Sequence, residues 1–288
     1  MLASISLAYL ITTALAQEDS PVHRVECPRQ VVLPMLPTAR QSPLIELEIG
    51  GQKYKFALDT GAVGGRISAE VVKRLGLKPE GKVMAGDPSG KNSREVSLYR
   101  IPQVKAAGAT LYGVQMMVED GVVPKGAPAY FDGVIGYAVF CDLLLTLDYP
   151  NRQVILTPGG MSPDQVSRSI PYQLEHGIPL LSVQIGDVKV GGHVDSGSDG
   201  GLSIPAKYKD RLHLEGEPRK VGQAKTLFNT TDIYLAKVKD PIYVGGIKMP
   251  IDQVEINDLF PFANIGGRLL HKFRVTIDQR KRRILFEA

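Results

Sequence analysis

The sequence predicts a mostly β protein whose two lobes come from the two halves of a duplicated chain. A short phrase occurs twice, as Ala57-Leu58-Asp59-Thr60-Gly61-Ala62 and as His193-Val194-Asp195-Ser196-Gly197-Ser198. A second block also recurs, as Gly133-Val134-Ile135-Gly136 and as Ala263-Asn264-Ile265-Gly266. From Leu44 onward apolar and polar residues alternate, and the 30 Gly and 20 Pro of the 288 residues indicate many turns.

The two copies stay in register over long stretches. An offset of 136 residues carries matching residues onto each other before and after the aspartates: Pro43 and Pro179, Gly50 and Gly186, Gly65 and Gly201. In the second block, Gly136 precedes Asp148 by 12 residues and Gly266 precedes Asp278 by 12 residues. Matching residues at a constant offset around the aspartates, together with an equal spacing in the second block, are improbable by chance. We therefore interpret the chain as a tandem duplication.

The N-terminal residues have the composition of an export signal. Residues 1–16 contain an apolar stretch that ends in Ala14-Leu15-Ala16, a small-x-small cleavage pattern, and are predicted to be a signal peptide. The protein is therefore expected to be secreted or periplasmic. The apolar stretch is too short to span a bilayer and no later stretch qualifies, so no integral membrane span is expected. Residues 17–41 are Pro-rich and are predicted to form an irregular N-terminal arm.

The first lobe is assigned to residues 42–160 and begins with a hairpin. Residues 44–49 alternate in period two, Gly50-Gly51 supplies a turn, and residues 53–58 form the return strand that delivers Asp59. A short helix follows, with Ser68 as its N-cap and Gly76 at its end.

The second lobe is assigned to residues 161–288 and repeats this order. The segment 157–163 contains two prolines and two glycines and is the best linker candidate. Near the end, Arg280-Lys281-Arg282-Arg283 is interpreted as a solvated turn between the two final strands.

Charge and cysteine content exclude several classes of protein. The net charge of +4 is small, and basic segments with interleaved aromatic residues are lacking, so no nucleic-acid partner is expected. Cys27 and Cys141 are interpreted as two free or buried thiols, although a disulfide that ties the arm to the first lobe is the alternative. Neither cysteine has metal-ligand spacing and the five histidines are scattered, so no metal and no cofactor are predicted. His193 is interpreted as a strand residue rather than a catalytic one.

The duplicated motif carries a family resemblance. Asp59-Thr60-Gly61-Ala62, with the downstream Asp132-Gly133-Val134-Ile135-Gly136, resembles the retropepsin-like/pepsin-like aspartic protease superfamily, and the segment 142–156 is similar to its bacterial retropepsin-like branch. The resemblance covers most of residues 42–288 in two copies. It implies a bilobal acid-protease fold, in which two homologous β-barrel-like lobes enclose a cleft.

The resemblance also implies a site and a reaction. Asp59 and Asp195 would be the catalytic pair, Thr60 and Ser196 would lock their loops by reciprocal hydroxyl hydrogen bonds, and Gly61 and Gly197 would allow close backbone approach. A water held between the carboxylates would attack a peptide bond, with one carboxylate as base and one carboxylic acid as proton donor. Aspartic proteases are themselves the standard example of two carboxylates sharing one proton. The implied substrate is a polypeptide.

The two copies differ after their glycines, where Ala62 stands in the first and Ser198 in the second. A hydroxyl hydrogen bond from Ser198 to Asp195 would favour the ionised carboxylate there. We therefore predict that Asp195 is the ionised partner and that Asp59 carries the proton.

Two alternatives to a monomeric peptidase stay open at this point. Asn264 interrupts the hydrophobic pair that precedes the glycine of the second copy, which favours a non-catalytic peptide-binding or scaffold protein with a degenerate fold. Alternatively, each lobe pairs with its equivalent in another chain. Because one chain holds both motifs, we expect a monomer.

Overall fold

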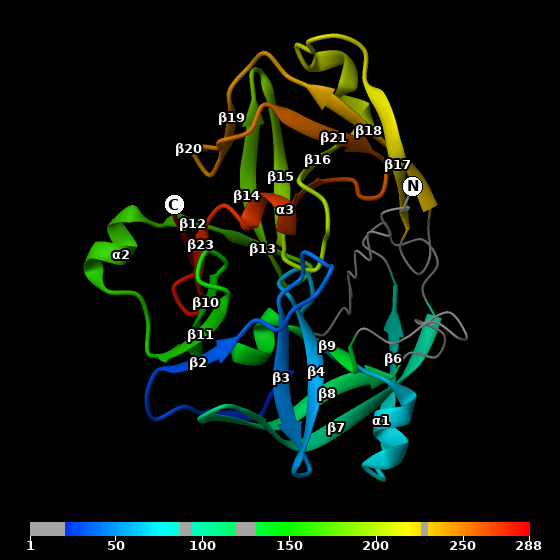
Figure 1. The fold of residues 1–288 in the computed structure, drawn as a ribbon, viewed down its shortest axis with the longest axis vertical. Helices are drawn as coiled ribbons and strands as arrows, with labels where there is room; N and C mark the ends of the chain where they lie inside the picture. Colours follow the sequence, from blue (N-terminus) through cyan, green and yellow to red (C-terminus); the bar gives the residue numbers. More distant parts are fainter. Residues whose placement is uncertain (1–20, 87–93, 119–130, 226–229) are drawn as a thin grey trace.

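The computed structural model describes residues 21–86, 94–118, 131–225 and 230–288. Strands account for 55% of the described residues and helices for 11%, which confirms the mostly β, two-lobed fold. The strands form three sheets, one in each lobe and one between the lobes (Figure 1). The predicted signal peptide, residues 1–16, lies outside the described residues, and the lobe boundary after residue 160 stays a prediction.

The first lobe is built on an eight-stranded sheet. Its strands follow the order β1-β8-β5-β9-β4-β3-β7-β6, and an additional pairing of β8 with β7 closes six of them into a barrel. The strands of this sheet are β1 (Arg24–Glu26), β3 (Leu44–Ile49), β4 (Gln52–Asp59), β5 (Gly65–Ile67), β6 (Pro79–Ala85), β7 (Arg94–Ala106), β8 (Ala109–Val118) and β9 (Gly133–Gly136).

Local sequence determines the start of this lobe as predicted. Gly50 and Gly51 both adopt positive φ, at 58° and 77°, and thereby form the tight turn between β3 and β4. The helix α1 (Ala69–Arg74) begins after Ser68, whose hydroxyl oxygen accepts the Val71 N–H as an N-cap.

The second lobe contains a ten-stranded sheet with the main order β17-β18-β21-β16-β22-β15-β14-β19-β20, and β13 pairs with β14. Its strands are β13 (Gln173–Glu175), β14 (Ile178–Ile185), β15 (Val188–Asp195), β16 (Leu202–Pro205), β17 (Arg219–Lys225), β18 (Thr230–Lys237), β19 (Ile242–Val244), β20 (Ile247–Lys248), β21 (Gln253–Asn257) and β22 (Ala263–Gly266).

A six-stranded sheet joins the two halves of the chain in the order β12-β24-β23-β10-β11-β2. The central pair β10 and β23 is antiparallel, and the hydroxyls of Thr146 and Thr276, which face each other in this pair, lie 2.9 Å apart. The strands are β2 (Val31–Pro34), β10 (Leu143–Asp148), β11 (Gln153–Pro158), β12 (Ile170–Pro171), β23 (Arg274–Asp278) and β24 (Arg283–Glu287).

The helical segments are short and lie at the connections between strands. In the second half, the helix α2 (Pro163–Arg168) begins with a capping box at Ser162 and Gln165. The helix α3 (Gly267–Leu270) directly follows β22. Two 3₁₀ helices span Tyr137–Phe140 and Ala206–Arg211.

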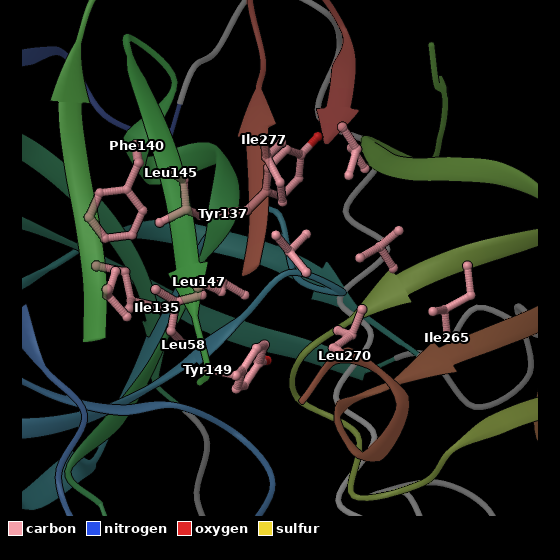
Figure 2. Packing of buried hydrophobic residues seen from close by; sticks show 14 of the residues in the cluster. Leu58, Ile135, Tyr137, Phe140, Leu145, Leu147, Tyr149, Ile265, Leu270 and Ile277 are labelled. Atoms are coloured by element: carbon pink, nitrogen blue, oxygen red, sulfur yellow. The ribbon is translucent and has the colours of Figure 1, made fainter. Parts of the chain in front are cut away.

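One continuous hydrophobic core passes from one lobe into the other. Figure 2 shows Leu58, Ile135 and Leu147 of the first half in the same packed region as Ile265 and Leu270 of the second half. All five side chains are at most 2% exposed. The shared core and the shared sheet hold the ends of β4 and β15 in a fixed relation.

The N-terminal arm differs from its prediction. Residues 17–41 were expected to be irregular, but β1 pairs with β8 and β2 pairs with β11 within this segment. The prediction was wrong because the pairing partners lie far along the chain, and local composition does not reveal such partners. No disulfide joins Cys27 and Cys141, in agreement with their interpretation as two separate thiols. In the described residues, no helix is both long enough and apolar enough to cross a membrane.

Candidate active site

Asp59 and Asp195 end equivalent strands and meet between the lobes. β4 runs parallel to β9 with Asp59 opposite Gly136, and β15 runs parallel to β22 with Asp195 opposite Gly266. Their side chains are only 1% and 0% exposed. The structure therefore brings together the two aspartates that the sequence singled out.

The glycine of each closing block is required by the loop that crosses it. A Cβ at Gly136 would lie 2.3 Å from the Gly64 carbonyl oxygen, and one at Gly266 would lie 2.4 Å from the Gly200 carbonyl oxygen. Only a residue without a side chain fits beneath these backbones. These two glycines therefore allow the loop after each aspartate to cross close above the closing block.

The hydroxyl residues after the aspartates form the reciprocal lock that the resemblance implied. The Thr60 N–H donates to Ser196 Oγ and the Ser196 N–H donates to Thr60 Oγ1, each at 2.9 Å. Each hydroxyl in turn donates to a main-chain carbonyl of the opposite lobe, Thr60 to Val194 and Ser196 to Leu58, both at 2.8 Å. Four hydrogen bonds between buried groups therefore fix one aspartate loop against the other.

Gly61 and Gly197 allow the two carboxyl groups to approach the opposite loops. A Cβ added at Gly61 would lie 2.9 Å from Asp195 Oδ1 and 3.2 Å from Asp59 Oδ1. A Cβ added at Gly197 would lie 2.4 Å from Asp59 Cγ. Each carboxyl group thus packs directly on the main chain of the other lobe's loop.

The two carboxyl groups have unequal hydrogen-bond partners. Asp195 Oδ1 accepts the N–H groups of Gly197 and Ser198 at 2.9 and 3.1 Å, and its Oδ2 accepts Asn264 Nδ2 at 2.9 Å. Asp59 Oδ1 accepts the Gly61 N–H at 2.8 Å, and its Oδ2 has no hydrogen-bond partner within the described part of the chain. Three donors therefore favour a negative charge on Asp195, against one on Asp59.

Burial shifts the pKa values of both carboxyl groups upward, and charge repulsion adds to the shift at Asp59. Burial raises the pKa of Asp59 well above its usual range, the negative charge of Asp195 raises it further, and the Arg66 guanidinium partly opposes this. Burial also raises the pKa of Asp195, but the hydrogen bonds from Asn264, Gly197 and Ser198 oppose the shift. The pair is thus arranged to hold one proton and one charge, with the proton favoured on Asp59.

The source of this asymmetry differs from the predicted one. The Ser198 hydroxyl was expected to donate to Asp195, but the Ser198 main-chain N–H makes that bond, and Ser198 Oγ accepts the Gly200 N–H at 3.2 Å. The side-chain donor is Asn264, which the sequence suggested only as a defect in a hydrophobic pair. The parallel pairing of β15 with β22 could have identified it, because it places Asn264 beside His193, two residues before Asp195.

The N-terminal arm also contacts the second loop, which sequence reasoning missed. Arg40 Nε lies 2.6 Å from Asp199 Oδ2, and the Gln41 N–H donates to Asp199 Oδ1 at 2.8 Å. Ser42, the first residue of the first lobe, donates its hydroxyl to the Gly197 carbonyl at 3.1 Å. The arm therefore stabilises the loop that carries Asp195, although the two segments are more than 150 residues apart.

His193 is a buried strand residue, as interpreted, and is uncharged at neutral pH. Its ring is fully buried and lies 3.9 Å from the Phe262 ring, centroid to centroid. Burial lowers its pKa to about 3, helped by the nearby His176, although a Glu175 carboxylate oxygen lies 3.5 Å from Nε2. The cost of burying a charged imidazole therefore outweighs the attraction of a half-exposed carboxylate.

This buried histidine is expected to make the fold sensitive to acid. The unfolded chain binds a proton at His193 near pH 6.5 while the folded chain resists it down to about pH 3. The free energy of unfolding should therefore fall as pH falls through this window, by about 1.4 kcal/mol per pH unit for the single proton. Urea unfolding between pH 7 and pH 4 should show a shallower pH dependence in His193→Phe. Equal slopes in the two proteins would contradict the assignment.

Within the described ranges, no group of three or more His, Cys, Asp or Glu side chains is arranged to hold a metal ion. Two buried carboxyls with one shared proton can act together as general acid and general base.

Comparison with known proteins agrees with this geometry. Residues 45–139 match the family model described as Aspartyl protease, a segment of about a third of the chain that contains Asp59 and its closing block. The second copy lies outside the matched residues. No curated protein matches the chain significantly. Through this matched segment, the chain is similar to the retropepsin-like aspartyl proteases.

Proposed function

We propose that this protein is an aspartic endopeptidase, which hydrolyses peptide bonds with a water activated between Asp59 and Asp195. The observation that carries the proposal is the convergence of two buried carboxyl groups from equivalent loops, fixed to each other by the Thr60–Ser196 lock. The match of residues 45–139 to an aspartyl protease family supports the same reaction class.

The unequal donors suggest a role for each aspartate. Asp195, with three hydrogen-bond donors, keeps its negative charge and takes a proton from the water as it attacks the peptide carbonyl. Asp59, with one donor and a raised pKa, carries the proton and gives it to the carbonyl oxygen. The leaving amine then departs with a proton returned through the pair, so no covalent bond to the protein forms.

The lock and the glycines contribute by positioning these groups. Rigid placement of the reacting carboxyls lets catalysis proceed without reorganisation at the moment of reaction. Thr60, Gly61, Ser196, Gly197 and Ser198 are therefore assigned to loop support rather than to proton transfer. An extended polypeptide would lie across the pair and hydrogen-bond through its main chain to strand edges.

The reaction requires only one chain. Both aspartates come from the same polypeptide, and the shared six-stranded sheet joins the halves that carry them. A monomer secreted or exported to the periplasm is the form in which we propose that it acts.

The non-catalytic alternative gives a different result in a turnover assay. The purified chain should cleave a reduced, unfolded protein at more than one molar equivalent, and mass spectrometry should identify new termini. A peptide with a statine residue should inhibit cleavage, because its hydroxyl-bearing tetrahedral carbon resembles the intermediate that forms when water adds to the peptide carbonyl. Chelators and serine-directed reagents should have no effect. Saturable peptide binding without turnover would instead favour the peptide-binding or scaffold protein.

A further inference from the structure

A polar row crosses the sheet of the second lobe beside Asp195. Asn264 faces His193 of β15 on one side and Ser203 of β16 on the other, and Ser203 in turn faces Glu255 of β21. Residues in register on neighbouring strands project from the same face of a sheet. The row therefore shares the face of Asp195, which lies two residues beyond His193 on β15.

The equivalent row of the first lobe has different chemistry. The matching pairings join Ala57 with Val134, Val134 with Arg66, and Arg66 with Met117. Asn264 thus takes the place of Val134, and Glu255 takes the place of Met117. Because the first lobe builds the same strand pairings with Val134 and Met117, the strand architecture itself does not require the two acceptor groups of the second lobe.

A small cavity lies against this row. Its volume is about 20 Å³, which is room for one group the size of a water molecule. The polar residues that line it are Ser198, Ser203, Glu255, Asn257 and Asn264. Ile233, Leu259 and Phe260 form an apolar wall beside them.

Asn264 lines this cavity and has an acceptor that is unused within the described residues. Its side chain is 4% exposed, its Nδ2 donates to Asp195, and its Oδ1 has no hydrogen-bond partner among the residues that the structure describes. The reverse amide orientation would place oxygen against a carboxylate oxygen and is unfavourable. A buried acceptor without a partner costs about 1–3 kcal/mol, so a donor in the cavity would recover this loss.

Glu255 adds a negative charge at the same place. It is 9% exposed, and its Oε1 accepts the Gly201 N–H at 3.0 Å. The Arg268 guanidinium reaches the same oxygen at 3.5 Å, but its side chain is 61% exposed. Within the described residues, both of these contacts involve Oε1 and neither occupies Oε2.

We propose that this cavity is a substrate subsite that receives the terminal ammonium group of a lysine side chain, an inference that rests on the proposed peptidase function. A compact ammonium group fits a space of about 20 Å³, whereas the planar guanidinium of arginine does not. Its three N–H donors match Glu255 Oε2, Asn264 Oδ1 and a hydroxyl or amide oxygen of the lining. The aliphatic stem would lie along Ile233, Leu259 and Phe260.

The subsite is tested with matched peptides that carry lysine, arginine or norleucine at each position around the cleaved bond. Norleucine has the apolar stem of lysine without the ammonium group. At one position the wild-type protein should prefer lysine over both alternatives, by about tenfold or more in kcat/KM. Glu255→Gln should reduce this preference to about twofold or less, because the amide has the same size but no charge. Glu217→Gln, which removes an exposed charge from the same lobe, should leave the preference unchanged.

A binding measurement keeps the two proposals separate. Calorimetry with the Asp59→Asn chain measures lysine selectivity in the absence of turnover, and adding Glu255→Gln should remove that selectivity. Absence of cleavage together with selective binding would contradict the peptidase and retain the subsite. Equal affinity or cleavage for lysine and norleucine at every position in the wild-type protein would overturn the subsite, since the cavity would then hold solvent only. That comparison needs no variant and holds even if Glu255→Gln does not fold.

Discussion

Replacing Asp59 by asparagine is expected to reduce peptide cleavage by roughly 10²–10⁴-fold, because an amide cannot carry the proton that the reaction transfers. The fold should survive this change. Asp59 Oδ2 has no hydrogen-bond partner in the described segments, so an amide nitrogen at that position displaces no donor. It would instead face the charged Asp195 with two N–H groups. We therefore expect loss of kcat with stability equal to, or above, that of the wild-type protein.

Replacing Asp195 by asparagine should remove activity to a similar extent but also destabilise the protein. Its two oxygens accept three donors, from Gly197, Ser198 and Asn264. An amide nitrogen in either position meets one of these donors and leaves it unsatisfied, at a cost of about 1–3 kcal/mol. The two variants should therefore lose similar activity but differ in stability. This difference distinguishes Asp59, the acid, from Asp195, the base.

Both variants should be compared with the wild-type protein by urea unfolding and by cleavage of an unfolded protein at several pH values. The wild-type rate should follow a bell-shaped pH profile. Below the pKa of Asp195 the base is protonated, and above the raised pKa of Asp59 the acid is lost. Substantial cleavage by either variant would refute the assignment of the pair.

The pH dependence of stability has the opposite sign at Asp59 from that at His193. A folded-state pKa raised above the unfolded value stabilises the protein below the unfolded pKa, and this stabilisation is lost as pH rises through the folded pKa. Asp59→Asn should remove that loss, so its advantage in stability over the wild-type protein should be larger at neutral than at acidic pH. The acid sensitivity that comes from His193 should persist in the variant.

Much of the site could be predicted because its parts are local and occur twice. Each feature lies within a short segment of the sequence: the strand that ends at each aspartate, the hydroxyl residue that follows it, and the closing glycine. The duplication then required two such loops to face each other, and the reciprocal hydrogen bonds of Thr60 and Ser196 agree with that expectation.

The features that could not be predicted depend on contacts between distant segments. The pairing of β2 with β11 and the contact of Arg40 with Asp199 leave no pattern in the local sequence. Asn264 was misinterpreted for a related reason. Within the segment 263–266 alone, Asn264 only interrupts a hydrophobic pair. Its role is clear only from the pairing of β22 with β15, which places its side chain within hydrogen-bond distance of Asp195.

Gly197→Ala is expected to have the largest effect after the two aspartate substitutions, and to act through geometry alone. A Cβ at this position would lie 2.4 Å from Asp59 Cγ and 2.5 and 2.6 Å from its two oxygens. Asp59 is buried and held by the Gly61 N–H, so it cannot rotate away without breaking that bond. The loops must therefore separate, which should cost about 1–3 kcal/mol of stability.

The accompanying loss of activity should exceed what the loss of stability explains. A displacement of about 1 Å between reacting groups can reduce the rate by about 10²-fold, so folded Gly197→Ala protein should still cleave poorly. Gly61→Ala should be milder, because its closest approach, to Asp195, is 2.9 Å. Gly222→Ala is the control, since no heavy atom lies within 4 Å of its added Cβ. Cleavage rates corrected for the folded fraction should rank Gly222→Ala above Gly61→Ala and Gly61→Ala above Gly197→Ala. Any other order would mean that the approach of each loop to the opposite carboxyl does not control the reaction.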